Sequence, residues 1–248
     1  MIALQDVHKS FGPNAVLRGV SLEVPKGQSL VVIGGSGSGK SVLLKCILGL
    51  EAPDAGRILY EGAPLDARRR GPFLSRFGML FQGGALFDSL PVWENICFRL
   101  LRGPGRLSRS AARERAVDKL ARVGLGPDVA ERHPAELSGG MQKRVALARA
   151  IAADPEVIFF DEPTTGLDPI MAGVINDLIR GIVTDMGATA ITITHDMASV
   201  RAIADEVAML HAGKIRWRGP VAAMDAAEDP YLRQFVTGAA EGPIETIR

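Results

Sequence analysis

The sequence lacks the features that mark several large classes of protein. No stretch reaches the ~18 consecutive apolar residues that a membrane-spanning helix needs, so any membrane role must come through a partner chain. The first residues, Met1 to Asp6, contain no basic region followed by an apolar run, and we therefore expect no signal peptide. Internal repeats and low-complexity segments are also missing.

Cysteine and net charge are scarce as well. The two cysteines, Cys46 and Cys97, each lie in an apolar stretch and form no Cys-x-x-Cys pair, so we expect buried free thiols in a reducing compartment. Charged residues make up 23% of the chain but nearly cancel, which leaves a formal net charge of +1. No overall field favours a polyanion, and we therefore expect no nucleic-acid partner.

Short apolar runs alternate with helical patterns along the chain. Core strands are predicted at residues 29–33, 157–160 and 190–194, where the apolar run is unbroken or nearly so. Residues 171–186 repeat apolar side chains at the spacing of an amphipathic helix. This alternation predicts an α/β protein with a mainly parallel sheet. The remaining predicted strands lie at residues 2–7 and 16–24 and, as a hairpin, at 206–210 and 214–218.

Two stretches interrupt this pattern. Residues 87–155 are rich in Arg and Ala and contain several Gly and Pro turns, which predicts a mostly helical insert. The run Asp66-Ala67-Arg68-Arg69-Arg70 could form a patch for lipid headgroups, but we interpret it as a solvated loop.

A glycine-rich loop follows the first core strand. Residues 34–41 fit the P-loop pattern G-x-x-x-x-G-K-[ST], between a predicted strand and a predicted helix. Its backbone N–H groups and the helix start can surround phosphate oxygens. Lys40 can contact the β- and γ-phosphates, and Ser41 can ligate Mg²⁺. The predicted phosphate-binding residues are Gly34, Gly35, Ser36, Gly37, Ser38, Gly39, Lys40 and Ser41. A dinucleotide pattern, G-x-G-x-x-G, does not fit, because Lys40 stands where it needs glycine.

Ionisable residues follow the other two core strands. Asp161 and Glu162 end the second strand, at the sheet edge where α/β proteins place ligand chemistry. Asp161 suits the Mg²⁺ shell, and Glu162 suits polarising the attacking water. His195 closes the third strand, and we assign it to the γ-phosphate as a sensor and water-orienting group. A solvated strand end is the alternative for the acids, and a structural histidine is the alternative for His195.

The order of motifs resembles that of the ATP-binding-cassette family. The chain contains, in sequence, the P-loop, Phe81-Gln82, the segment Leu-Ser-Gly-Gly-Met-Gln at residues 137–142, the acid pair, Asp168 and His195. The segment at 137–142 alone would suit a capped helix after a turn, with Ser138 as the N-cap. The joint set resembles the family from about residue 2 to residue 236.

The resemblance implies a fold and a division of the chain. The fold is a P-loop NTPase (RecA-like) core with an antiparallel β subdomain and an inserted helical subdomain. The implied ATPase domain covers residues 2–236, with core and β subdomain at 1–86 and 155–236 and helical subdomain at 87–154. Residues 237–248 would form a C-terminal tail, of which residues 239–248 would reach across to a second copy.

The resemblance also implies a head-to-tail dimer that shares its ATP sites. The γ-phosphate held by Lys40 of one copy would be capped by the other copy's signature residues, which are Ser138, Gly139 and Gly140. Gln82 would contact Mg²⁺ and water, and Asp168 would span the dimer. Phe11 and Val16 would stack on adenine. The family's usual Tyr is Phe11 here, and its usual fifth signature Gln is Met141.

Within the family, residues 80–95 and 234–243 look like those of Mla-type and mammalian-cell-entry-type transporter ATPases. That branch implies phospholipid transport between membranes. The implied partners are an integral-membrane permease, a lipid-binding mammalian-cell-entry protein and, in some members, a small STAS-domain subunit. The chain would lie on the cytoplasmic face of the bacterial inner membrane, with residues 85–90 in a groove for a permease helix. The alternatives are an importer ATPase for amino acids or ions and a non-transport, cluster-assembly ATPase.

Overall fold

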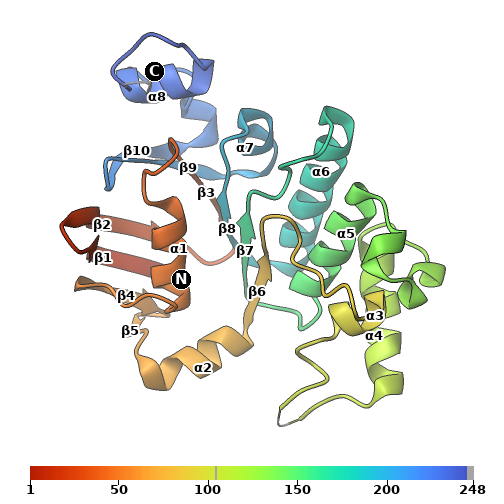
Figure 1. Cartoon of the computed structure of the whole chain (residues 1–248). Coiled ribbons are helices and arrows are strands. Elements are labelled where there is room, and N and C mark those ends of the chain that lie inside the picture. Colours follow the sequence, from red (N-terminus) through yellow and green to blue (C-terminus); the bar gives the residue numbers. More distant parts are fainter. Residues whose placement is uncertain (104, 245–248) are drawn as a thin grey trace. The chain divides into compact units, whose positions relative to one another are not determined.

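The computed structural model describes residues 1–103 and 105–244. The chain divides into two compact units, Met1–Phe73 with Ile191–Arg248, and Leu74–Ala190. Their boundaries fall inside α2 and β8 (Figure 1).

The strands are β1 (Ile2–Phe11), β2 (Asn14–Val24), β3 (Ser29–Ile33), β4 (Ala55–Tyr60), β5 (Ala63–Pro64), β6 (Phe77–Leu80), β7 (Val157–Asp161), β8 (Thr189–Ile193), β9 (Glu206–His211) and β10 (Lys214–Pro220). The α-helices are α1 (Lys40–Leu48), α2 (Ala67–Ser75), α3 (Val92–Ile96), α4 (Arg109–Arg122), α5 (Gly139–Ala150), α6 (Pro169–Met186), α7 (Met197–Ile203) and α8 (Pro230–Thr237).

An antiparallel sheet in the first unit contains four strands in the order β2-β1-β4-β5. Strands β1 and β2 pair along their whole length, from Ile2 opposite Val24 to Phe11 opposite Asn14. Both strands are longer than the sequence predicted, β1 by residues 8–11 and β2 by residues 14–15, because these residues lack a clear apolar alternation. The antiparallel sheet is present as expected, and the predicted α/β class is confirmed.

The first unit also contains the strand that precedes the P-loop. All five residues of β3 are buried, and β3 pairs in parallel with β9. The predicted hairpin is confirmed: β9 pairs antiparallel with β10 through a turn at Ala212 and Gly213. Both turn residues have positive φ, 47° and 77°, as tight hairpins with right-handed twist require.

The second unit combines two parallel strands with the helices α3, α4, α5 and α6. Strand β6 pairs in parallel with β7, with Phe77 opposite Val157. The predicted helical insert contains α3, α4 and α5, which pack against one another, together with two 3₁₀ turns (Figure 1). The second compact unit contains β6, β7 and α6 as well as this insert. The predicted subdomain boundaries at residues 87 and 154 therefore stay predictions.

Helix α6 is the amphipathic helix that the sequence predicted. It begins at Pro169 behind the N-cap Asp168 and ends before Gly187, which adopts the left-handed conformation with φ of 59°. Its buried residues are Ile175, Asn176, Ile179, Ile182 and Val183. None of the helices among residues 1–103 and 105–244 combines the length and apolar character that crossing a bilayer requires.

The prediction of a loop at residues 66–70 was wrong. Helix α2 begins at Ala67, because the Asp66 carboxylate accepts hydrogen bonds from the backbone N–H groups of Arg68 (2.9 Å) and Arg69 (3.0 Å). This contact satisfies N–H groups that a helix start leaves unpaired. Arg70 then lies beside Gly49, where any larger residue would collide with the guanidinium.

The residues after α8 fold back onto it. The side-chain amide of Gln234 donates to the carbonyl oxygens of Ala239 (3.2 Å) and Ile244 (3.1 Å), and its oxygen accepts from the N–H of Ile244 (2.7 Å). The predicted tail at 237–248 overlaps the last residue of α8, and residues 245–248 lie outside the described residues. The predicted reach of the tail toward a second copy stays a prediction.

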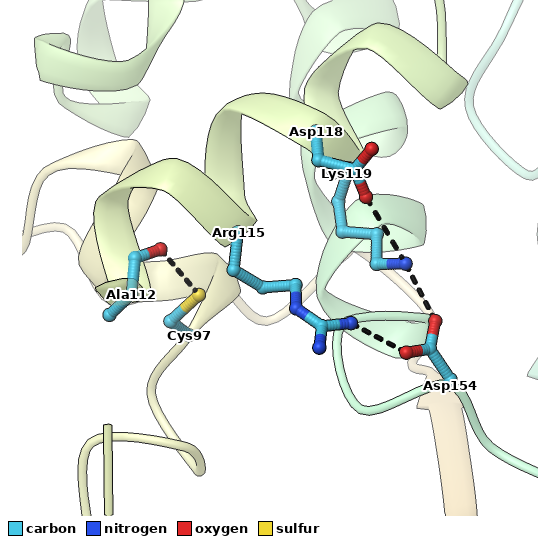
Figure 2. A network of polar contacts seen from close by, with 6 residues as sticks. All are labelled: Cys97, Ala112, Arg115, Asp118, Lys119 and Asp154. Carbon is cyan, nitrogen blue, oxygen red and sulfur yellow. Dashed lines mark hydrogen bonds and ion pairs between the residues drawn. The ribbon is translucent and has the colours of Figure 1, made fainter. Parts of the chain in front are cut away.

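Ion pairs join α4 to the turn between α5 and β7. Figure 2 shows Asp154 accepting from Lys119 (2.6 Å) and from Arg115 (2.5 Å), both on α4. Nearby, the Cys97 thiol donates to the carbonyl oxygen of Ala112 (3.0 Å), and burial raises the pKa of this thiol to about 11. Both cysteines are free and buried, as predicted.

The Asp154 contacts predict a pH-dependent contribution to stability. Burial opposes ionisation, but hydrogen bonds and charge from Lys119 and Arg115 outweigh it and lower the pKa of Asp154. Asp154→Asn keeps the side-chain shape and tolerates the local φ of 47°. At neutral pH this substitution should lower the free energy of unfolding by about 1–2 kcal/mol, because it leaves Lys119 buried without its charged partner. The half-exposed position of the carboxylate keeps the effect this small.

Thermal melts of the two proteins across pH test this expectation. An aspartate with a lowered folded-state pKa stabilises the fold above its unfolded pKa, and that stability is lost as pH falls through the folded value. The gap between the melting temperatures should thus be full at pH 7 and shrink below about pH 4. A gap that stays constant down to pH 2 would contradict the ionic origin of the effect.

Candidate functional site

The P-loop has the geometry that its sequence predicted. Strand β3 ends at Ile33, the loop runs through Gly34 to Gly39, and α1 begins at Lys40. A Cβ at Gly34 would collide with the carbonyl oxygen of Leu210, so only glycine fits there. Gly37 has φ of 74° and faces open space, which leaves room for a ligand close to the backbone.

Two polar side chains of this loop indicate that it binds an anion. The Lys40 ammonium donates to the carbonyl oxygens of Gly34 (2.7 Å) and Gly35 (2.9 Å), which holds a positive charge over the loop. The Ser38 hydroxyl is buried and has no hydrogen-bond partner among the described residues. A buried hydroxyl without a partner is costly, and a phosphate oxygen would satisfy it. The residues present therefore fit a phosphate group.

The predicted adenine-binding residues lie in the same unit as the P-loop. Phe11 ends β1 with 45% of its surface exposed, and the Lys9 ammonium lies 5.2 Å from the ring centroid. Val16, on β2, lies against the end of the P-loop, because a Cβ at Gly39 would come within 3.2 Å of Val16 Cγ1. The structure thus brings Val16 to the loop and leaves one aromatic side chain available for stacking.

His195 also belongs to the first unit. It is exposed and follows the buried Thr194 at the end of β8. The next residue, Asp196, caps α7 by accepting from the N–H groups of Ala198 (3.0 Å) and Ser199 (3.3 Å). The histidine is therefore held between a buried strand end and a capped helix, so its backbone position is fixed.

The acid pair lies in the second unit, at the end of β7. Asp161 is the last strand residue, and Glu162 follows with φ of 47°, a left-handed conformation that a non-glycine side chain seldom adopts. The Thr165 hydroxyl donates to Glu162 Oε2 (3.2 Å). Backbone strain of this kind persists where the surroundings fix it, and it is common at functional sites.

Two side-chain caps begin the helices that carry the other predicted residues of this unit. Asp168 Oδ1 accepts from the N–H groups of Ile170 and Met171, both at 3.0 Å, and starts α6. Ser138 Oγ accepts from the N–H of Met141 (3.3 Å) and starts α5, as predicted. The two helix starts lie side by side, because a Cβ at Gly140 would come within 2.6 Å of Met171 Cε.

The loop that carries Gln82 is anchored to α5. Gln82 itself is exposed, but the Arg149 guanidinium donates to the carbonyl oxygens of Gly84 (2.6 Å) and Ala85 (2.7 Å). Burial lowers the pKa of Arg149 below its usual value. The last turn of the helix that begins with the signature segment thus holds the backbone of this loop.

The chain after this loop is fixed by one buried amide. Asn95 is fully buried, and its oxygen accepts from the N–H of Phe87 (2.7 Å). Its nitrogen donates to carbonyl oxygens of Phe87, Leu90 and Pro91. The Phe87 ring remains 42% exposed while it stacks on Phe98, with ring centroids 4.3 Å apart. An exposed aromatic ring on a rigid loop suits a protein contact.

Three residues, Asn95, Lys143 and Arg149, carry no sequence pattern that predicted a role for them. The spacing of Lys143, Ala146, Leu147 and Ala150 places Lys143 on the buried face of α5, and this signal was available. The carbonyl partners of Arg149 lie more than sixty residues away in sequence, so no local pattern indicates them.

The predicted Mg²⁺ contacts come from both units. Ser41 belongs to the first unit, and Gln82 and Asp161 belong to the second. No cluster of three or more His, Cys, Asp or Glu side chains suited to a metal occurs in the part of the chain that the structure describes. A magnesium ion needs no such cluster when one or two side chains and substrate phosphates hold it. The side chains of Ser, Gln and Asp carry oxygen atoms, the ligand type that Mg²⁺ prefers, so the residue types at these positions fit the ion.

Comparisons with known proteins agree with this geometry. A family model described as ABC transporter matches residues 17–165. The intermembrane phospholipid transport system ATP-binding protein MlaF of Escherichia coli K12 is 40% identical over 98% of this chain and 91% of MlaF. Protein TRIGALACTOSYLDIACYLGLYCEROL 3, chloroplastic, of Arabidopsis thaliana is 40% identical over 98% of this chain and 75% of that protein. The probable ribonucleotide transport ATP-binding protein mkl of Mycobacterium leprae is 38% identical over 98% of this chain and 70% of mkl.

Solved structures are similar as well. The ATP-binding cassette MJ0796, a dimer in a post-hydrolysis state bound to ADP and Pi, matches with a TM-score of 0.79 and 30% identity, covering 89% of this chain and 99% of that chain. The cbiO1 protein of Clostridium perfringens, part of the ABC transporter complex cbiONQ, matches with a TM-score of 0.82 and 27% identity, covering 92% and 91%.

The contact between Arg149 and the Gln82 loop predicts a local change on mutation. Arg149→Gln removes two hydrogen bonds from a charged donor, so the loop should open more often. We expect amide hydrogen exchange at residues 83–87 to become about tenfold faster or more, because the loss exceeds about 1.4 kcal/mol. Mass spectrometry of peptides from this loop measures the rate.

Arg144→Gln provides the matched control on the same helix. Arg144 makes a long hydrogen bond, 3.4 Å, to the carbonyl oxygen of Gly124, whereas the hydrogen bonds to the Gln82 loop come from Arg149. Its replacement should leave exchange at residues 83–87 unchanged. Equal acceleration by both variants would show that a general loss of stability, and not the Arg149 contact, sets the rate.

Proposed function

The chain belongs to the ABC transporter family as an ATPase that uses ATP with Mg²⁺, and from this premise we propose that it powers phospholipid transport between membranes. One observation carries the proposal: the similarity to the phospholipid transport protein MlaF extends over 98% of this chain and 91% of MlaF. The sequence of residues 80–95 and 234–243 supports the same branch of the family.

We assign the phosphates of ATP to the loop between β3 and α1. Its backbone N–H groups and the buried Ser38 hydroxyl supply hydrogen-bond donors, and Lys40 supplies charge to the β- and γ-phosphates. The two oxygens that now accept from Lys40 are neutral carbonyls, so a charged phosphate oxygen would be a stronger acceptor. Phe11 and Val16 would contact the adenine ring.

The proposed chemistry needs a fixed carboxylate and a polarised water. Mg²⁺, when bound, offsets negative charge on the phosphate oxygens. Ser41, Gln82 and Asp161 would hold the ion through their oxygen atoms. Glu162 would accept a hydrogen bond from the attacking water and align it, while His195 would contact the γ-phosphate. The rigid backbone at Glu162 supports this role, because a catalytic base must be held in one geometry.

As an ABC ATPase the chain dimerises and works with a membrane permease. In the proposed dimer, the start of α5 of one copy faces the nucleotide of the other. The Ser138 hydroxyl and the amides of Gly139 and Gly140 would cap the γ-phosphate, with the positive end of the helix behind them. Asp168 would lie at the dimer seam. Gly139 faces open space, which leaves room for this approach.

The permease would contact the loop held by Asn95. Phe87 is exposed there, and the Arg102 guanidinium covers the other aromatic partner, Phe98, at 3.5 Å from its ring centroid. The anchor from Arg149 to the preceding residues would transmit movement of α5 to this surface. A lipid-binding mammalian-cell-entry protein and a small STAS-domain subunit complete the proposed assembly, on the cytoplasmic face of a bacterial inner membrane.

Substitution of Glu162 by Gln tests the catalytic assignment. The amide keeps the size of the side chain but accepts protons poorly, so ATP binding should persist while turnover falls by about 10²–10⁴-fold. Fluorescent-nucleotide titration and phosphate release measure the two quantities. Lys40→Ala is the comparison, because it removes a phosphate contact and should weaken binding itself. Wild-type turnover in the Glu162→Gln protein would remove Glu162 from this role.

Reconstitution tests the proposed cargo. The chain would be purified with its permease and placed in vesicles of phosphatidylethanolamine and phosphatidylglycerol that contain a fluorescent phospholipid. ATP should drive transfer of this lipid to acceptor vesicles, and the Glu162→Gln complex should not transfer it. Native mass spectrometry of the detergent-purified complex should detect bound phospholipid.

The relative mkl is named as a probable ribonucleotide transport protein, so ribonucleotides are a second cargo to compare. A ribonucleotide other than an adenine nucleotide, such as uridine monophosphate, added to the same vesicles should neither stimulate ATP hydrolysis nor accumulate inside them. Stimulation by ribonucleotides, amino acids or metal ions without lipid transfer would overturn the phospholipid proposal and leave the ATPase assignment intact. A preparation that retains no permease would instead favour a non-transport ATPase.

A further inference from the structure

Lys9 is a largely buried lysine beside the ring that we assign to adenine. Its side chain is only 13% exposed, and its ammonium lies over the Phe11 ring, 5.2 Å from the ring centroid. The two residues are two positions apart on β1, so their side chains leave the strand on the same face. A cation at this distance is attracted by the negative face of an aromatic ring. The contact therefore restrains the ring.

The loop after α1 holds the Lys9 ammonium in place. The ammonium donates to the carbonyl oxygen of Ala52 (2.9 Å) and to Asp54 Oδ1 (3.4 Å). Glu51 Oε2 lies 3.7 Å away and adds a second negative charge. A lysine side chain is among the most flexible in proteins, and ordering it costs conformational entropy. These oxygen atoms offset that cost and fix the end of the side chain.

The same loop is joined to the backbone of β1 on both sides of Lys9. The N–H of Asp54 donates to the carbonyl oxygen of His8 (2.8 Å), and Asp54 Oδ2 accepts from the N–H of Ser10 (2.6 Å). All of these residues belong to the first compact unit, together with the P-loop. Backbone hydrogen bonds as well as the contacts of the ammonium thus determine where Lys9 lies.

The Phe11 ring needs such a restraint if it is to bind a base efficiently. The ring is nearly half-exposed at the end of β1. A side chain that is free to rotate must be ordered when a ligand stacks on it, and this ordering lowers the affinity. A ring that a cation already holds on one face loses less freedom on binding. Its opposite face can then receive a base.

We propose that Lys9 is a positioning residue that holds the Phe11 ring in place for the adenine base of ATP. The inference rests on the proposed contact between Phe11 and adenine. The ammonium covers one face of the ring, and the base stacks on the other. The loop that fixes the ammonium directly follows α1, the helix that begins at the P-loop. The sites for the base and for the phosphates are thus joined through one helix.

A double-mutant cycle in nucleotide affinity tests the proposal. ADP with Mg²⁺ is the probe, because it carries the same base and leaves no γ-phosphate to hydrolyse. Lys9→Met removes the charge and keeps an unbranched side chain, and it should weaken ADP binding about three- to tenfold. In the Phe11→Ala background the same substitution should change the affinity by less than about twofold, because no ring is left to position. Calorimetric titration measures the four affinities.

Lys26→Met is the matched control for the loss of one positive charge. Lys26 is exposed in the turn before β3, at the opposite end of this strand from the P-loop, and its replacement should leave ADP affinity unchanged. Lys9→Arg keeps a cation that can lie on the ring and should restore most of the affinity. Lys9→Gln loses the charge but can still donate to Ala52, so it decides the outcome if Lys9→Met does not fold. Equal weakening by a Lys9 substitution with and without the Phe11 ring would overturn the proposal.

Steady-state kinetics separate positioning of the base from a purely structural role. Lys9→Met should raise KM for ATP and leave kcat within about twofold, because the ring contacts the base and not the reacting phosphate. A lower kcat with unchanged KM would contradict the proposal.

Phe11→Ala alone tests the premise. It should weaken ADP binding about tenfold or more, since stacking of a base on an aromatic ring contributes at least that much. Unchanged affinity in this variant would overturn the adenine contact and the role of Lys9 with it. Weakened affinity with additive Lys9 effects would overturn the role of Lys9 alone.

Discussion

The charged side chains proposed for the site follow strands that are buried and almost wholly apolar, and the arrangement of this protein depends on that placement. All residues of β3 are buried and apolar except the first, and β7 is buried until its last residue. Polar chemistry begins immediately afterwards, with the P-loop after Ile33 and the acid pair after Phe160. The P-loop and the acid pair are therefore placed by the local sequence, because each directly follows the end of a buried strand, where ligand-binding groups can lie.

Helix α5 contacts several other elements of the second unit. Its first turn contacts α6 at Met171, its middle carries the buried Lys143, and its last turn holds the Gln82 loop through Arg149. Beyond the C-terminal end of α5, Asp154 accepts a hydrogen bond from Lys119 and so joins the turn after α5 to α4. These contacts combine one unpaired charge with several well-paired ones.

The parts of the structure that sequence could predict are those with a local signal. The P-loop, β3, β7 and α6 each have a spacing or apolar run that specifies them, and the caps of Ser138 and Asp168 follow from residue type. Helix α2 was missed because a run of arginines resembles a solvated loop, although Asp66 before it is a good helix start. Contacts such as those of Arg149 and Lys143 depend on tertiary packing and leave no periodic pattern that is specific to function.

The buried thiol of Cys97 has a practical consequence for spectroscopy. A pKa of about 11 leaves roughly one thiol in ten thousand ionised at neutral pH, and only the thiolate reacts readily with maleimides. Burial raises the pKa of Cys46 too. Fluorophores or spin labels attached through a cysteine introduced on the surface would therefore mark that position alone, with both native thiols left in place.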